Sequence, residues 1–170
     1  TYRAAVDLGG SLTQDKRLTS RFNVMYQNTG SHRQFETSDR FGIAPSLAYK
    51  ISDKTTFLTE FSYQKVNTLI GAAYTFGPVA NGYGSLDRGF AMLDKNFPST
   101  DIKEASILNK LTHQFNDNWS VEAKYVAMNY NQVGASAWLG DLQANGDAIR
   151  TINIWDAISE GQYFQLYTNG

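Results

Sequence analysis

The chain contains no cysteine among its 170 residues, and only three prolines and two histidines. Without cysteine there can be no disulfide, no thiolate nucleophile and no cysteine-based metal site. No apolar run reaches the length of a transmembrane helix, so helical membrane spans are not expected. The formal net charge is -1. With no clustered Lys and Arg, a nucleic-acid-binding surface is not expected either.

Aromatic residues, by contrast, are abundant. The chain has ten Tyr, ten Phe and three Trp, yet its mean hydropathy of -0.39 is polar. This pairing is typical of transmembrane β-barrels, because only alternate strand residues meet lipid while loops and lumen stay polar. Soluble β proteins rich in aromatics have a similar composition. Composition therefore indicates a β protein, but it does not decide between a membrane barrel and a soluble protein.

The stretch from Phe41 to Lys65 shows the clearest periodicity. Its residues separate into an apolar alternate set and a small or polar one, which predicts a β-hairpin with a turn at 52–55. Proline lacks the N–H that a strand ladder needs, which implies a local bulge or an unpaired position. Because a closed barrel has no edge strand for a proline, a β-bulge is expected at Pro45. The apolar set is Phe41, Ile43, Pro45, Leu47, Tyr49, Phe57, Thr59, Phe61 and Tyr63.

The same alternation predicts strands on both sides of this hairpin. They cover residues 2–8, 18–27, 104–115 and 119–130, with two weakly alternating strands at 150–158 and 162–169. Short turns are expected near residues 10, 53, 117 and 160, and long loops at 28–39, 66–103 and 131–149. In a meander every second connection lies at the same end, so all the long loops would share one end. Outer-membrane barrels have this asymmetry, with short periplasmic turns and long extracellular loops.

The two faces of the predicted strands differ in chemistry. The apolar face has no charge in its central stretch and has aromatics near strand ends, as the interface girdles of a membrane barrel require. Strands of about nine to eleven residues suit a tilted bilayer crossing. We therefore predict an all-β, antiparallel up-and-down transmembrane β-barrel, with a soluble barrel as the alternative. The charged residues of the other face are Arg3, Asp7, Arg21, Glu60, Lys110, Glu122 and Lys124.

In a membrane barrel these charged residues would line the lumen. They could form a polar wall that ligand and water pass. They could equally form cross-strand ion pairs that satisfy buried charges and support what fills the barrel. Neither reading involves catalysis, and no catalytic residue is predicted. His32 and His113 lack a second histidine nearby, so no metal site is predicted.

Four segments carry a family resemblance when they are taken in order. They read "DLGGSL", "RFNVMYQ", "IAPSLAYKISDKTTFLTEFSYQ" and "LTHQFNDNWSVEAKYVAMNYN". Together they resemble the N-terminal third of the barrel of TonB-dependent siderophore receptors of the bacterial outer membrane. Such receptors are 22-stranded barrels with a plugged lumen. The resemblance implies that residues 1–170 form about seven or eight of those strands, with the plug domain and the remaining strands absent.

The resemblance also implies a transport function. Such a receptor binds a ferric siderophore and imports it, driven by TonB, which would act through the absent N-terminal plug. The implied partners are outer-membrane lipid, the ferric siderophore and TonB. Iron would enter only as a siderophore chelate, so no cofactor bound directly by side chains is expected. The alternative is a small eight-stranded outer-membrane barrel, an adhesin or structural anchor, whose first strand would pair with its last.

Aromatic residues in the long predicted loops are the candidate ligand contacts. Aromatic side chains offer large contact area at low entropic cost, and an arginine can pair with an anionic chelate. Packing of each aromatic against its own loop is the alternative role. The candidates are Tyr74, Phe76, Tyr83, Arg88, Phe90 and Trp138.

Overall fold

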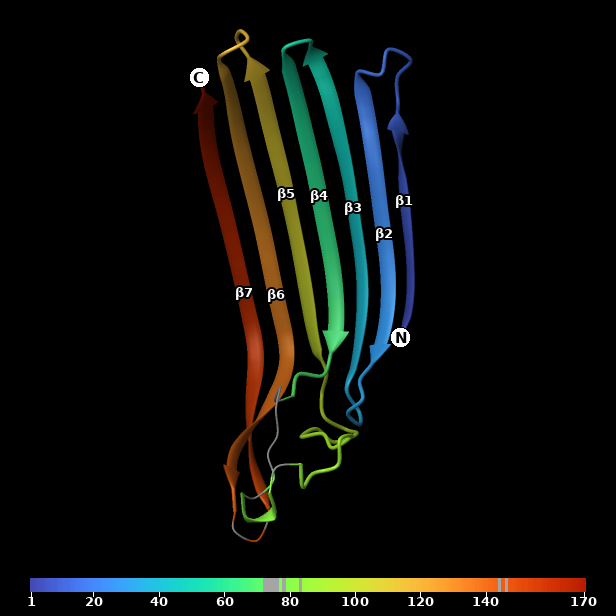
Figure 1. Cartoon of the computed structure of the whole chain (residues 1–170), viewed down its shortest axis with the longest axis vertical. Coiled ribbons are helices and arrows are strands. Elements are labelled where there is room, and N and C mark those ends of the chain that lie inside the picture. The colour runs from blue at the N-terminus through green and yellow to red at the C-terminus, as the bar shows by residue number, and fades with distance from the viewer. Residues whose placement is uncertain (72–76, 78, 83, 144, 146) are drawn as a thin grey trace.

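The computed structural model describes residues 1–71, 77, 79–82, 84–143, 145 and 147–170. These form one seven-stranded antiparallel sheet in which every strand pairs with its neighbours in the chain (Figure 1). The predicted all-β, up-and-down class is confirmed. The strands are β1 (Tyr2–Ser11), β2 (Leu18–Gly30), β3 (Thr37–Ser52), β4 (Thr55–Thr68), β5 (Thr100–Gln114), β6 (Ser120–Leu142) and β7 (Ala148–Asn169), with one 3-10 helix, η1 (Val79–Asn81).

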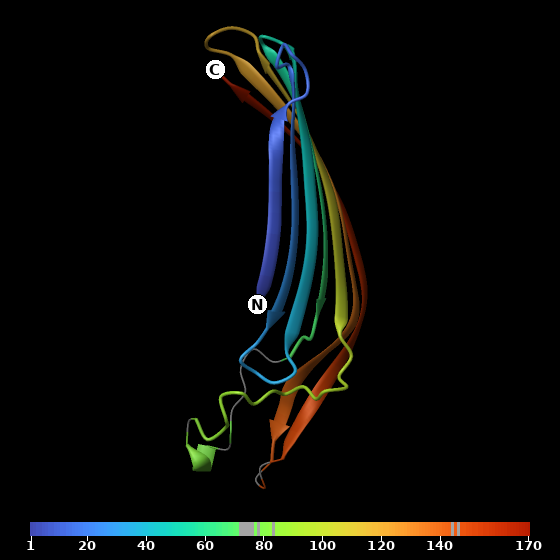
Figure 2. The same cartoon turned by 90° about the vertical axis from the view of Figure 1, so that its right-hand side faces the viewer.

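The sheet has the shape of a wall segment. Figure 2 shows it bowed along the strands, with the long loop curving away on the concave side. In the described sheet β1 and β7 are the two edges. Within the described residues, no helix is long and apolar enough to cross a membrane.

The connections differ at the two ends of the sheet. One end carries three short connections, at residues 12–17, 53–54 and 115–119. The other end carries the 31-residue connection between Thr68 and Thr100, drawn largely in green in Figure 1. We call the first the turn end and the second the loop end. The predicted asymmetry is therefore present, although one connection supplies most of it.

Two of the predicted loops are mostly strand. Residues 131–142 belong to β6, and the sequence around 160 continues β7 without a turn. Glu160 and Gly161 resemble a turn in sequence, but they pair with Asn129 and Met128 across the ladder. Cross-strand pairing overrides the local turn preference here. In the same way, β2 and β3 shorten the predicted loop at 28–39 to residues 31–36.

The predicted bulge at Pro45 is wrong. Pro45 pairs with Phe22 of β2, and on the other side β3 pairs with β4 at Ile43 and again at Ser46 with no shift of register. Within the described β3–β4 ladder, Ala44 and Pro45 have no partner on β4, so Pro45 occupies an unpaired position rather than a bulge. A missing N–H removes a hydrogen bond, but it does not force an extra residue into the strand. The register shift in this hairpin lies between Lys50 and Ser52, beside the turn.

The most buried apolar residues of the described chain lie at the loop end rather than inside the sheet. Leu93 and Phe97 of the long loop pack with Ala135 and Ala137 of β6, and Leu69 packs against them. Both faces of the main sheet are exposed or half-buried rather than buried, as in a barrel wall with lipid on one side and a lumen on the other. The small core therefore fixes the long loop onto the β6–β7 hairpin.

Candidate functional site

The outer face of the wall is an apolar belt bounded by aromatic residues. The ladders place Phe41 opposite Tyr26, and Tyr49 opposite Phe57, on the same side of the sheet. Eight residues separate Phe41 from Tyr49, which is about 27 Å of strand at about 3.4 Å per residue. A tilt of about 40° reduces this to roughly 20 Å, close to the apolar band of about 25 Å in outer-membrane barrels.

The inner face carries the predicted charged residues, and the structure brings several of them together. Arg21 binds Asp7 through two hydrogen bonds, Nε to Oδ1 at 2.9 Å and Nη2 to Oδ2 at 2.6 Å. Lys110 and Lys124 lie directly opposite each other on β5 and β6. The Glu122 carboxylate forms salt bridges with both lysines. Its Oε1 lies 2.8 Å from Nζ of Lys124, and its Oε2 lies 3.6 Å from Nζ of Lys110. Lys124 also lies 5.1 Å from the ring centre of Tyr167.

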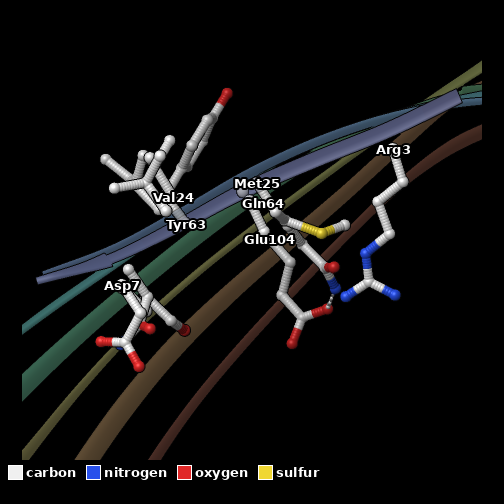
Figure 3. Close-up of a pocket in the computed structure, with 14 residues that line it drawn as sticks. Arg3, Asp7, Val24, Met25, Tyr63, Gln64 and Glu104 are labelled. Atoms are coloured by element: carbon white, nitrogen blue, oxygen red, sulfur yellow. Dashed lines mark hydrogen bonds between the residues drawn. The ribbon is translucent and has the colours of Figure 1, made fainter.

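A hollow of about 510 Å³ runs across the middle of this face, over β1 to β5. Figure 3 shows Arg3, Asp7, Met25, Gln64 and Glu104 on one side of the sheet. Gln64 donates to Glu104 at 2.8 Å. Arg3 is exposed and lines the hollow, and Glu60 is exposed elsewhere on the same face. The face therefore offers charges and amides to whatever occupies the concave side.

At the loop end, Gly134 of β6 lies directly against the start of β5. Its φ is +149°, and a Cβ there would overlap the Cα of Thr100. Only glycine permits this approach. The buried Thr100 hydroxyl donates to the Ala135 carbonyl at 2.7 Å, joining the start of β5 to β6 beside Gly134.

The long loop is held to the hairpin by polar contacts as well. Arg150 of β7 donates from Nη1 to the Met92 carbonyl at 2.8 Å and to Asp94 Oδ2 at 3.3 Å. The amide of Ala137 donates to the Ile70 carbonyl at 3.0 Å. Sequence reasoning did not single out Arg150. An arginine in a weakly alternating strand gives no local signal of a partner 56 residues away.

Two tryptophans of the β6–β7 hairpin hydrogen-bond to the same buried serine of β6. The Ser136 hydroxyl accepts from Trp138 Nε1 at 3.2 Å and from Trp155 Nε1 at 2.9 Å. Trp155 lies opposite Gly134, which has no side chain to compete for the space. Ser136 is fully buried, whereas 42% of Trp138 and 36% of Trp155 are exposed. Trp138 was predicted as a contact residue, while Trp155 and Ser136 were not.

The remaining predicted contacts lie on the long loop. Arg88 and Phe90 are exposed in a turn closed by a hydrogen bond from the Phe90 amide to the Asp87 carbonyl at 2.9 Å. The Gln34 amide ties this turn to the β2–β3 connection through the Gly89 carbonyl, also at 2.9 Å. Tyr74, Phe76 and Tyr83 lie outside the described residues. A ligand-binding role for the six candidates stays a prediction.

The turn end shows ordinary surface electrostatics. The Thr13 side chain and the backbone amide of Arg17 hydrogen-bond Asp15 and lower its pKa. The ammonium of Lys50 lies 2.9 Å from Oδ1 of Asp53 and lowers the pKa of that carboxyl. Among the residues that the structure describes, no group of three His, Cys, Asp or Glu side chains could hold a metal ion.

Comparison with known proteins finds similar sequences among bacterial receptors. No family model matches the chain. It is 25% identical over 149 residues to the ferrioxamine B receptor of Salmonella typhimurium strain LT2, covering 84% of this chain and 21% of the relative. It is 24% identical over 149 residues to the metal-pseudopaline receptor CntO of Pseudomonas aeruginosa strain PAO1. This match covers 88% of this chain and 21% of the relative. The chain thus spans about a fifth of the length of the curated relatives it matches.

Solved structures agree on the fold. The ferric-catecholate import receptor Fiu of E. coli K12 matches 98% of this chain over 28% of its own, with a TM-score of 0.77 and 17% identity. The ferripyoverdine receptor of the outer membrane of Pseudomonas aeruginosa matches 98% of this chain with 23% of its own, at a TM-score of 0.83 and 17% identity. The predicted resemblance to TonB-dependent siderophore receptors and the predicted β-barrel-wall fold are confirmed, and these relatives are receptors of the outer membrane. These relatives are receptors rather than enzymes.

Proposed function

We propose that this chain forms part of the wall and extracellular mouth of a TonB-dependent receptor that binds a ferric siderophore and imports it. The observation that carries the proposal is the pair of half-exposed tryptophans anchored on Ser136 at the loop end. The relatives' names support the ligand class, since they refer to ferrioxamine B, metal–pseudopaline, ferric catecholates and ferripyoverdine.

The chemistry of the loop end suits such a ligand. A ferric siderophore presents flat organic groups around a chelated metal, and a rigid indole offers contact area without much loss of entropy. The shared serine fixes both indoles before a ligand arrives, which reduces the cost of ordering them on binding. Arg88 on the neighbouring loop is exposed and can pair with an anionic chelate. Iron stays on its chelator throughout.

The inner face suits a plugged barrel. In the proposed receptor, the charges on the concave side face a plug domain rather than an open channel. TonB supplies the energy of import through that plug, drawing on the inner-membrane proton gradient. The likeness to full-length receptors supports this arrangement, of which the wall described here is one part.

The sheet edges favour this function over the alternative. A complete eight-stranded anchor or adhesin would pair its first strand with its last. In the described sheet β1 pairs with β2 alone and β7 with β6 alone. The rows of unpaired backbone groups on β1 and β7 are the edges at which further strands of a larger barrel would add.

Iron uptake tests the proposal. The gene that encodes the complete polypeptide is deleted from the host. Uptake of radioactive iron is then measured with ferric hydroxamate, catecholate and pyoverdine-type siderophores. We expect deletion to abolish TonB-dependent uptake of at least one of them, and the wild-type gene to restore it. Unchanged uptake of every siderophore, with growth unaffected under iron limitation, would contradict the proposal.

Binding by variants locates the site. Trp138→Ala and Trp155→Ala should each weaken binding of that siderophore about tenfold or more, as loss of an aromatic anchor does. Trp119→Ala, at the turn end, is the matched control and should bind as the wild type does. Equal binding by all three variants would place the site elsewhere.

A further inference from the structure

The inner wall of the β6–β7 hairpin carries no charge where the hairpin extends beyond the other strands at the loop end (Figure 1). The ladder keeps one register from Ser120 to Leu139, so the face that carries Glu122 and Lys124 continues along the hairpin. Beyond Met128 and as far as Leu139, the described residues of this face have aromatic, amide, hydroxyl or small side chains. They are Tyr130, Gln132, Gly134, Ser136, Trp138, Thr151, Asn153, Trp155, Ala157 and Ser159.

The polar groups of this wall are neutral. The Tyr130 hydroxyl donates to Oε1 of Gln132 at 2.7 Å, and Asn153 is exposed on the same face. At the same level of the ladders toward β3, the inner face carries Glu104 and Arg40, which have opposite signs. The wall therefore offers aromatic surface together with uncharged donors and acceptors.

Cations at the loop end are held by carboxylates of the same end. Nη1 of Arg150 lies 3.3 Å from Oδ2 of Asp94, on the long loop. Nε of Arg33 lies 3.2 Å from Oε2 of Glu36, in the β2–β3 connection. Each pair removes one positive charge from those that a ligand could meet.

The loop end has no surplus of positive charge in its sequence either. Residues 31–36, 69–99 and 139–150 contain four Arg or Lys against five Asp or Glu, with His32 counted as neutral. Arg88 is exposed, but it directly follows Asp87, so their turn adds no net charge. A cleft concentrates an ionic ligand when one sign of charge dominates its lining. These segments provide no such excess for a polyanion.

We propose that the ligand is a ferric chelate without net negative charge, of the tris-hydroxamate class, rather than a polyanionic tris-catecholate. This inference rests on the proposed function, because it specifies the charge of the ligand that this function requires. Three singly charged hydroxamates cancel the charge of ferric iron, whereas three doubly charged catecholates leave a triple negative charge on the complex.

The contacts available on the wall suit the neutral chelate. A polyanion bound here would lose hydration without gaining an ion pair from the wall. A neutral chelate places its aliphatic linkers against the two indoles and its carbonyl and amide groups against Gln132 and Asn153. Indole faces also attract cations, so a positively charged group on the ligand strengthens binding. Arg88 can still donate to one ligand oxygen, although Asp87 beside it cancels its charge.

Binding of two matched chelates to the complete natural polypeptide tests the inference. The purified receptor in detergent is titrated with ferric complexes of a tris-hydroxamate and a tris-catecholate chelator built on the same tripodal backbone. Quenching of tryptophan fluorescence gives each Kd. We expect the tris-hydroxamate to bind at least about tenfold more tightly. Its Kd should change less than about twofold between low and high salt, since the chelate has no net charge to be screened.

A cation added to the wall should reduce this preference. Asn153 lies opposite Ser136, to which both indoles donate, so Asn153→Lys places an ammonium group beside them. We expect the variant to bind the tris-catecholate about tenfold more tightly than the wild type does, and the tris-hydroxamate no more tightly. Asn153→Gln lengthens the side chain without charge and should keep the wild-type preference. Asn118→Lys adds the same charge at the turn end and should bind both chelates as the wild type does.

The outcomes separate this inference from the proposed function. Equal or tighter binding of the tris-catecholate by the wild type would overturn the inference and leave the proposed function standing. A preference unchanged by Asn153→Lys would also overturn it, because this wall would then not select the charge of the ligand. Binding of neither chelate, with no TonB-dependent uptake of either, would contradict the proposed function and this inference with it.

Discussion

Arg150 and Asp94 join two parts of the chain that lie 56 residues apart, with Nη1 of the arginine 3.3 Å from Oδ2 of the aspartate. The same nitrogen donates to the Met92 carbonyl. Because Arg150 belongs to β7 and Asp94 to the long loop, this contact sets the position of the loop relative to the hairpin. The loop end is thus one packed unit, although its pieces are distant in sequence.

Loosening this contact should free the loop without weakening the barrel. Arg150→Ala removes charge-assisted hydrogen bonds, each worth about 1.5–3 kcal/mol. We expect amide hydrogen exchange across residues 91–99 to accelerate at least tenfold, while exchange in β2 to β5 stays unchanged. Arg150→Lys, which keeps the positive charge and a single donor nitrogen, should give an intermediate rate. Exchange equal to that of the wild type would show that the apolar contacts of Leu93 and Phe97 suffice.

The close approach of β6 to the start of β5 should depend on glycine at position 134. Gly134→Ala introduces a Cβ that overlaps the Cα of Thr100 at a φ of +149°. We expect a loss of about 1–3 kcal/mol in the free energy of unfolding, the range for overpacking. Gly10→Ala is the control, because a Cβ there meets nothing within 4 Å. Urea denaturation of both variants in detergent would separate them, and equal midpoints would contradict the packing described.

Ser136 should control the environment of both indoles. Ser136→Ala removes the hydroxyl that accepts from Trp138 and Trp155. In a Trp119→Phe background, the fluorescence of the hairpin tryptophans should shift in wavelength, and siderophore binding should weaken. Ser31→Ala, on an exposed loop, is the matched control. An unchanged spectrum would mean that the shared hydrogen bonds do not fix the indoles.

The turn end should show a small acid dependence at Asp53. The ammonium of Lys50 lowers the pKa of this carboxyl, so the contact stabilises the fold above the ordinary aspartate pKa of about 3.9 and is lost as pH falls through the lowered value. Asp53→Asn should therefore be slightly less stable than the wild type at pH 7 and equal to it near pH 2. Urea midpoints at the two pH values would check this. A difference that persists near pH 2 would point to the turn geometry instead.

Much of the wall could be predicted from the sequence because period-two alternation is local. The register places Phe41, Ile43 and Tyr63 on one face and Glu60 on the other, as the alternation indicates. The β6–β7 hairpin could not be predicted in the same way. Its residues contact the long loop on one side and bury Ser136 on the other, so neither face is uniformly apolar.

The candidate site, like the fold, could be predicted from the sequence only in part. Trp138 was proposed because an aromatic in a predicted loop is a reasonable contact; the structure puts it in β6, and its contact role stays a prediction. Trp155 and Arg150 act through partners in other elements, and no short pattern marks such pairs. The misjudged turn at Glu160 and bulge at Pro45 have one cause. Local preferences for Gly and Pro were weighed without the ladder that overrides them.

The account depends most on which face of the strands meets lipid. Single spin labels at Ile43, Leu47, Ala44 and Ala48 of β3, introduced into the cysteine-free background of this chain within the complete natural polypeptide in membranes, report this directly. We predict high accessibility to oxygen at positions 43 and 47, and to a water-soluble nickel chelate at positions 44 and 48. High nickel accessibility at all four positions would contradict a membrane barrel, because it would place both faces in water.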